Sequence, residues 1–94
     1  MNDPLFEWDE DKAASNFRKH QVSFTESATV FNDEFIATML DPNHSGMEER
    51  FIAIGLSVKS RVLVVSYTER GEKTRLISCR KATPAERKQY EKGK

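Results

Sequence analysis

The strongest constraint on the fold is a set of three apolar, β-branched segments in the second half of the chain. They are FIAIGLS at 51–57, RVLVVSYT at 61–68 and TRLISC at 74–79. Residues of these types favour strands. The connectors between them are short, and short connectors suit hairpins because parallel strands need a long crossover. The pattern predicts an antiparallel meander.

A strand and a helix are predicted before this meander. Apolar and polar residues alternate over 5–8, as in a short strand. Asp9 is a good N-cap for a helix that runs to about Lys19. Ala13 and Phe17 lie four residues apart on one face of that helix, so both are expected to be buried.

Two capping boxes mark further helices. The first, S-x-x-E at 23–26, opens a helix whose apolar side chains recur with helical spacing at Phe24, Ala28 and Phe31. A strand at 35–40 and a loop at 41–47 follow. The second box, T-P-A-E at 83–86, opens a helix that ends near Lys92.

The predicted architecture is α+β. Two N-terminal helices cover one face of a four- to five-stranded, mostly antiparallel sheet, and the C-terminal helix stands apart. Ninety-four residues are too few for two cores, so residues 1–94 are expected to form one domain. The core should contain the aromatic side chains at amphipathic spacing, which are Trp8, Phe17, Phe24, Phe31 and Phe51.

Charge is unevenly distributed, although the formal net charge is zero. Residues 1–49 carry three basic and eleven acidic side chains, whereas residues 50–94 carry twelve basic and four acidic ones. This asymmetry is typical of chains in which one half meets a polyanion. The alternative is that the two halves attract each other within the fold.

Cysteine usage and apolar runs exclude several classes of protein. Cys79 is the only cysteine, which suits a reducing cytoplasm. The N-terminus lacks the apolar stretch of a signal peptide, and the longest aliphatic run, at 62–65, is too short to span a membrane. His20 and His44 show no metal-ligand spacing. We expect a cytoplasmic protein with no membrane segment, metal or cofactor.

Four segments of the chain, taken in order, form a recognisable set. They are FEWDEDKAASNFRKHQVSF (6–24), HSGMEERFIAIGLS (44–57), RVLVVSYTER (61–70) and TRLISCRKATPAERKQYE (74–91). Together they resemble the BrnT toxin family over nearly the whole chain. The chain departs from the family at Gln21, where a glycine is expected after Lys-His.

The resemblance implies a RelE-like fold and metal-independent cleavage of RNA that inhibits translation and growth. It also implies a BrnA-type antitoxin with a ribbon-helix-helix DNA-binding domain. The complex of toxin and antitoxin would repress its own operon, with the antitoxin contacting the operator DNA.

Cleavage by the RNA's own 2′-hydroxyl needs a base, an acid and cations around the phosphorane. Arginine suits the last task because its planar fork binds phosphate oxygens in pairs and stays charged. Histidine suits proton transfer near neutral pH, and a glutamate before Arg50 could act as base. The candidate catalytic residues are therefore His20, Glu49, Arg50, Arg61 and Arg80, of which the last three also match the family pattern.

A second group of residues could contact RNA without taking part in proton transfer. Cations and a hydroxyl could bind phosphate oxygens, and a tyrosine could stack on a base. These candidates are Lys19, Arg70, Arg75, Ser78 and Tyr90.

Structural explanations compete with these roles. Strand-end arginines often only keep a sheet edge soluble, and a histidine at a helix end interacts favourably with the helix dipole. Tyr90 could instead anchor the C-terminal helix. At the level of function, the alternative is a non-catalytic module that binds the antitoxin and modulates its DNA binding. An autonomous DNA-binding domain is disfavoured, since the chain has no helix-turn-helix pattern.

Overall fold

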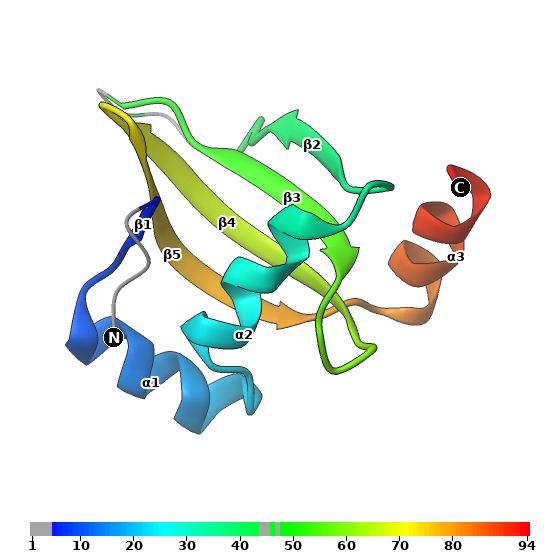
Figure 1. Ribbon diagram of the computed structural model, residues 1–94, viewed down its shortest axis with the longest axis horizontal. Coiled ribbons are helices and arrows are strands. Elements are labelled where there is room, and N and C mark those ends of the chain that lie inside the picture. Colours follow the sequence, from blue (N-terminus) through cyan, green and yellow to red (C-terminus); the bar gives the residue numbers. More distant parts are fainter. Residues whose placement is uncertain (1–4, 44–45, 47) are drawn as a thin grey trace.

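A five-stranded sheet with helices around it makes up the fold (Figure 1). The structure, a computed structural model, describes residues 5–43, 46 and 48–94. The strands are β1 (Phe6–Glu7), β2 (Ala37–Leu40), β3 (Phe51–Leu56), β4 (Val62–Arg70) and β5 (Lys73–Lys81). The helices are α1 (Glu10–His20), α2 (Phe24–Ala28), the 3-10 helix η1 (Thr29–Asn32) and α3 (Pro84–Lys92).

The predicted antiparallel meander is confirmed. The strand order is β1-β5-β4-β3-β2, and the pairs from β2 to β5 are antiparallel. The short β1 pairs in parallel with β5, through Phe6 opposite Thr74 and Glu7 opposite Arg75. A bulge between Ser66 and Tyr67 shifts the register of β4 against β5. The fold is the α+β arrangement that the sequence predicts.

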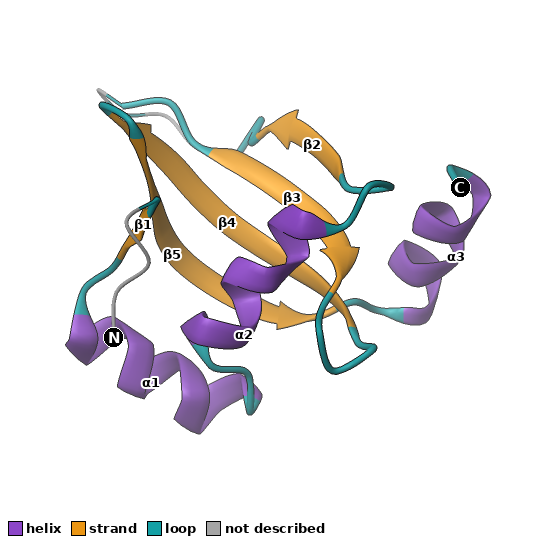
Figure 2. Ribbon diagram, viewed as in Figure 1, coloured by secondary structure: helices purple, strands orange, loops and turns teal. Residues whose placement is uncertain are grey.

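Helices α1, α2 and η1 lie over one face of the sheet, with α1 beside β5 and α2 and η1 crossing the middle strands, whereas α3 stands apart beyond the end of the sheet (Figure 2). The core lies between these layers. The side chains at every second position of β4 point into this core; they are Leu63, Val65 and Tyr67. Four of the five aromatic residues predicted for the core pack in it or against it; these are Trp8, Phe24, Phe31 and Phe51.

The prediction for Phe17 is wrong, because its side chain is half exposed (50%). Helix α1 is turned so that Asn16 faces the sheet and is buried instead. Amphipathic spacing treats an asparagine as a surface residue. It therefore missed a polar side chain whose hydrogen bonds all lie inside the protein.

The first capping box is half formed. The hydroxyl of Ser23 accepts a hydrogen bond from the backbone N–H of Glu26, as an N-cap does. The carboxylate of Glu26 does not return to the cap. It is buried and accepts hydrogen bonds from Ser57 Oγ (2.7 Å) and from Nε of Arg61 (2.9 Å), with a second contact to the same guanidinium. A buried ion pair thus joins α2 to the start of β4.

The second capping box, at the start of α3, has both of its hydrogen bonds, as predicted. Near the other end of that helix, Tyr90 is buried and its hydroxyl donates a hydrogen bond to the carboxylate of Asp33. That carboxylate also accepts the backbone N–H of Leu56 at 2.8 Å. Helix α3 is therefore fixed to the end of η1 and to β3. Within the described residues, no helix is long and apolar enough to cross a membrane.

Gln21, where the chain departs from the family pattern, ends α1 in the left-handed region with φ 60°. A β-carbon costs about 1–2 kcal/mol in this conformation, and glycine avoids that cost. Glycine is also more flexible in the unfolded chain. We expect Gln21→Gly to raise the free energy of unfolding by about 0.5 kcal/mol in urea titrations. Gln21→Ala should give no gain, and an equal gain from both variants would contradict this explanation.

The ion pair between Glu26 and Arg61 should contribute to the response to acid. The hydrogen bond from Arg61 holds the pKa of Glu26 below its ordinary value of 4.5, against the opposing effect of burial. A lowered pKa in the folded state contributes stability above the ordinary pKa. This contribution is lost as the pH falls through the folded value.

We expect Arg61→Ala to lower the free energy of unfolding at pH 7 by about 3 kcal/mol, because it leaves a buried carboxylate without its cation. Glu26→Gln should remove the part of the acid sensitivity below pH 4.5 that comes from this carboxylate. Urea unfolding at pH 7 and pH 4 measures both effects. The exposed Arg87, changed to Ala, is the matched control. A loss for Arg61→Ala no larger than that for the control would show that the pair is dispensable.

Candidate functional site

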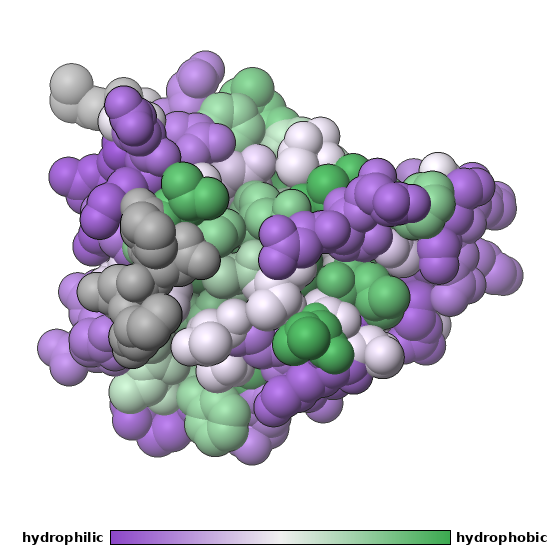
Figure 3. All heavy atoms as spheres, viewed as in Figure 1, coloured by the Kyte–Doolittle hydropathy of each residue, from purple (hydrophilic) through white to green (hydrophobic). Residues whose placement is uncertain are grey.

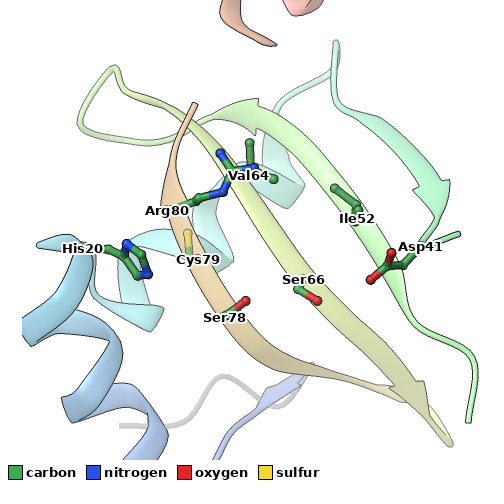
Figure 4. A pocket seen from close by; sticks show the side chains of 8 residues that line it. All are labelled: His20, Asp41, Ile52, Val64, Ser66, Ser78, Cys79 and Arg80. Carbon is green, nitrogen blue, oxygen red and sulfur yellow. The ribbon is translucent and has the colours of Figure 1, made fainter. Parts of the chain in front are cut away.

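A cleft of about 440 Å³ lies on the face of the sheet that α1 and α2 leave open (Figure 4). Three strands form its floor, the end of α1 forms one wall, and the segment after β2 forms the opposite wall. The lining residues are His20, Asp41, Ile52, Val64, Ser66, Ser78, Cys79 and Arg80.

Strand register aligns the floor of the cleft. Ile52, Ser66 and Ser78 lie directly opposite one another on β3, β4 and β5. Val64 and Arg80 form the next pair on the same face, two residues along each strand. The bulge after Ser66 does not disturb this part of the sheet. Two hydroxyls and one guanidinium are therefore presented side by side.

Cys79 lies between Ser78 and Arg80, but its side chain belongs to the core. Burial raises the pKa of its thiol to about 11. The thiol therefore stays protonated at neutral pH and is an ordinary buried side chain.

The side chain of Asn16 positions the helical wall of the cleft. Its Nδ2 donates to the backbone oxygens of Cys79 (2.9 Å) and Val22 (3.0 Å), and its Oδ1 accepts the backbone N–H of Cys79 at 3.0 Å. The amide thus takes the place of a neighbouring strand on β5. His20, four residues after Asn16, is consequently held beside Ser78.

Lys19 stands next to His20 on the same wall. It lines a smaller hollow that shares His20 and Ser78 with the cleft. A cation at this position extends the positive edge of the cleft along α1. Both side chains also lie in the last turn of the helix, where they interact favourably with the helix dipole.

Arg80 reaches across the sheet toward Val64 (Figure 4). Glu86, from the first turn of α3, holds its guanidinium. The contact is bidentate, with Nη1 to Oε1 at 2.7 Å and Nη2 to Oε2 at 2.9 Å. The hydrogen bond from Arg80 is the main cause that lowers the pKa of Glu86 to about 2. The pair therefore persists at neutral pH.

An arginine has five N–H donors. In the described part of the chain, Glu86 and the backbone oxygen of Lys81 account for three hydrogen bonds of Arg80. The side chain is also 43% exposed. Arg80 can thus bind an anion in the cleft while it is still paired with Glu86.

Two of the candidate residues have structural partners away from the cleft. Arg61 lies at the same end of the sheet as Arg80, but its side chain turns to the helix-covered face and pairs with Glu26. Tyr90 anchors α3 through Asp33, which is the structural alternative considered for it.

Four further candidates gather at the opposite end of the sheet. Glu7 lies 3.1 Å from Nη1 of Arg75 and 3.9 Å from Nε of Arg70. Arg50 Nε is 3.9 Å from a carboxylate oxygen of Glu48, and the backbone oxygen of Glu49 accepts a hydrogen bond from Thr68. None of these residues lines the cleft, although Arg50 is the neighbour of the cleft residue Asp41 in the β2–β3 ladder. His44 lies outside the described residues.

Asp41 and Ser66 line the cleft, and the sequence-based reasoning did not select either of them. Asp41 sits in a segment interpreted only as a loop. Ser66 falls within a strand whose apolar content predicted burial. The one available signal was alternation, because Ser66 shares strand parity with Val64, whereas the core residues of β4 occupy the odd positions.

The arrangement defines a class of protein: a small α+β domain whose open sheet face carries a cleft lined by basic and hydroxyl-bearing side chains. His20 can exchange a proton there, Arg80 and Lys19 supply positive charge, and Ser78 supplies a hydroxyl. These are side chains that can bind and polarise a phosphodiester.

Comparison with known proteins agrees with this class. A family model described as "Ribonuclease toxin, BrnT, of type II toxin-antitoxin system" matches residues 8–86. The chain therefore belongs to the BrnT toxin family. No curated protein sequence shows significant similarity to it.

The fold is similar to the crystal structure of the Brucella abortus ribonuclease toxin BrnT, with a TM-score of 0.61 and 23% identity. The match covers 83% of this chain and 95% of the Brucella chain. At this identity the likeness establishes the fold, and the α+β arrangement is thus supported independently of the sequence pattern.

Asn16→Asp tests whether the amide holds α1 in place. The carboxylate keeps an acceptor for the N–H of Cys79 but loses both donors, so two backbone oxygens lose their partner. We expect the free energy of unfolding to fall by about 3 kcal/mol, measured by urea titration. Asn32→Asp, at an exposed position, is the matched control. A loss no larger than that of the control would contradict the role given to Asn16.

Proposed function

We propose that this protein is an endoribonuclease that cleaves RNA in the cleft by attack of the RNA's own 2′-hydroxyl. The observation that carries the proposal is the juxtaposition of His20, Ser78 and Arg80, from two different elements, in one open cleft. The membership of a ribonuclease toxin family supports it. The cleft volume is in the range that holds a small ligand or a nucleotide.

In the proposed reaction the 2′-oxygen attacks phosphorus and the bond from phosphorus to the 5′-oxygen breaks. The products are a 2′,3′-cyclic phosphate and a free 5′-hydroxyl. His20 transfers one of the two protons that move, while Arg80 and Lys19 bind the phosphorane oxygens and Ser78 donates a hydrogen bond. All of these groups are side chains of the protein, so the proposed mechanism is independent of metal.

We propose further that a BrnA-type ribbon-helix-helix antitoxin neutralises the toxin in the cytoplasm and contacts operator DNA within the complex. The family belongs to type II toxin-antitoxin systems, which implies an antitoxin partner. Apolar side chains that a partner could cover are exposed on β2 and on the β3–β4 hairpin, among them Leu40, Leu56 and Val58. The helix-bearing face shows apolar residues interspersed among polar ones (Figure 3). An antitoxin segment over the cleft would exclude RNA.

A non-catalytic role, as an interaction module that modulates DNA binding by the antitoxin, is the second candidate. One observation favours it, since the bidentate contact with Glu86 occupies part of the guanidinium that a phosphate would use. The two functions differ in what happens when the protein is produced without its partner.

Expression of the wild type without antitoxin should arrest growth and degrade RNA, and Arg80→Ala should lower the cleavage rate by about 100-fold or more, because it removes charge stabilisation of the transition state. Growth curves and the integrity of total RNA measure this. Arg87→Ala, which removes the same charge from an exposed position of α3, should remain toxic.

Circular dichroism and urea unfolding must first show that Arg80→Ala is folded. Arrest by a folded Arg80→Ala variant at the wild-type level would remove Arg80 from the site. If the soluble wild type degrades no RNA and leaves growth unchanged, the protein is the interaction module instead.

A further inference from the structure

The cleft has two chemically different ends. His20, Ser78 and Arg80 make one end cationic and polar, whereas Asp41 at the other end carries a carboxylate. Figure 4 shows Asp41 on the far side of the floor from His20, next to Ile52. Arg50 lies opposite Asp41 in the β2–β3 ladder, so this end of the cleft has a cation beside the carboxylate. The carboxylate itself accepts hydrogen bonds and suits a part of the substrate that donates them.

Asp41 is held in place by its backbone. Its N–H donates to the backbone oxygen of Arg50 at 2.8 Å, which extends the β2–β3 ladder by one residue. Its Oδ1 accepts the backbone N–H of Asn43 at 3.0 Å. Each carboxylate oxygen has two acceptor positions. Within the described residues, Oδ2 accepts no hydrogen bond and Oδ1 accepts one, so both oxygens can accept hydrogen bonds from a ligand.

The floor beside Asp41 suits a planar ring. Ile52 presents aliphatic surface on β3 next to Asp41, and Val64 continues this surface on β4 toward Arg80, so the face of a nucleobase can pack there. Ser66 lies between this surface and Ser78 and offers a hydroxyl that can donate or accept. An apolar floor edged by fixed polar groups is typical of a site that recognises one small molecule.

The Arg80 end and the Asp41 end of the cleft are too far apart to bind the same chemical group. Arg80 and Asp41 are separated by three strand spacings across the sheet and, by the strand register, by four residues along it, so their backbones lie about 19 Å apart. One end can therefore hold the phosphate while the other contacts a base.

We propose that Asp41 selects guanine next to the cleaved bond. This inference rests on the proposed ribonuclease function and names the base that the same cleft recognises. Among the four bases, guanine alone presents two neighbouring N–H donors, N1–H and the 2-amino group, on its Watson–Crick edge. A carboxylate accepts both in the parallel geometry that it forms with arginine. Adenine and cytosine offer one amino group beside an acceptor, and an acceptor would face the carboxylate.

Two measurements test the assignment. Cleavage sites are mapped on oligoribonucleotides that differ only in the base beside the cleaved bond, for the wild type and for Asp41→Asn. Binding of 3′-GMP, 3′-AMP, 3′-CMP and 3′-UMP is followed by NMR titration of the same proteins. Asparagine keeps an acceptor for Asn43 but replaces one carboxylate oxygen by a donor. Asp9→Asn, the same change at an exposed N-cap where asparagine caps equally well, is the matched control.

We expect the wild type and Asp9→Asn to prefer guanine in both measurements, and Asp41→Asn to lose at least about tenfold of that preference. Cleavage without base preference, or an unchanged preference in Asp41→Asn, would overturn the assignment while leaving the ribonuclease function in place. If RNA is not cleaved at all, the proposed function fails. The titrations then decide the base site alone, because guanine-selective binding that depends on Asp41 supports it and equal binding of all four nucleotides excludes it.

Discussion

The hydrogen bonds of one side-chain amide hold the helical and the sheet parts of the cleft together. β1 covers only the beginning of the outer edge of β5, and Asn16 bonds to that edge further along, at Cys79. Three buried backbone groups depend on this amide for a partner, and each would cost about 1–3 kcal/mol if left without one. Helix α1 consequently has one low-energy position on the sheet. The position of His20 relative to Ser78 follows from it.

One face of the sheet, covered by helices, contains the contacts that stabilise the fold, and the other face carries the cleft. Arg61 and Arg80 lie at the same end of neighbouring strands, yet one turns toward the helices and the other toward the cleft. Arg61 neutralises the carboxylate of Glu26, which is almost fully buried, so its charge stabilises the fold and is not available to a ligand. Arg80 remains 43% exposed, and its partner Glu86 comes from a helix at the edge of the domain. The second arginine therefore keeps access to solvent and to an anionic ligand.

Helix α3 connects the cleft to the rest of the fold at two points. Its first turn reaches Arg80 through Glu86, which also closes the capping box with Thr83. Its last turn is fixed through Tyr90 to Asp33. A helix this short and polar is marginal by itself. Its position depends on these contacts, and the orientation of Arg80 in turn depends on the position of the helix.

The sequence by itself determined the strands, the meander, the capped starts of the helices and the α+β class, because these follow from local preference and from the lengths of connectors. It also selected His20, Ser78 and Arg80 by residue type. Only the tertiary structure decided which of the candidates meet. Four residues that were equally plausible in the sequence do not line the cleft; they are Glu49, Arg50, Arg70 and Arg75. Asp41, from a segment predicted only as a loop, does line it. The physical reason is that the face to which a side chain points and the groups that it meets there depend on strand register and on partners distant in sequence. Asn16, which bonds from α1 to β5, and Glu26, which pairs with Arg61, are such partners, and the local sequence pattern does not reveal them.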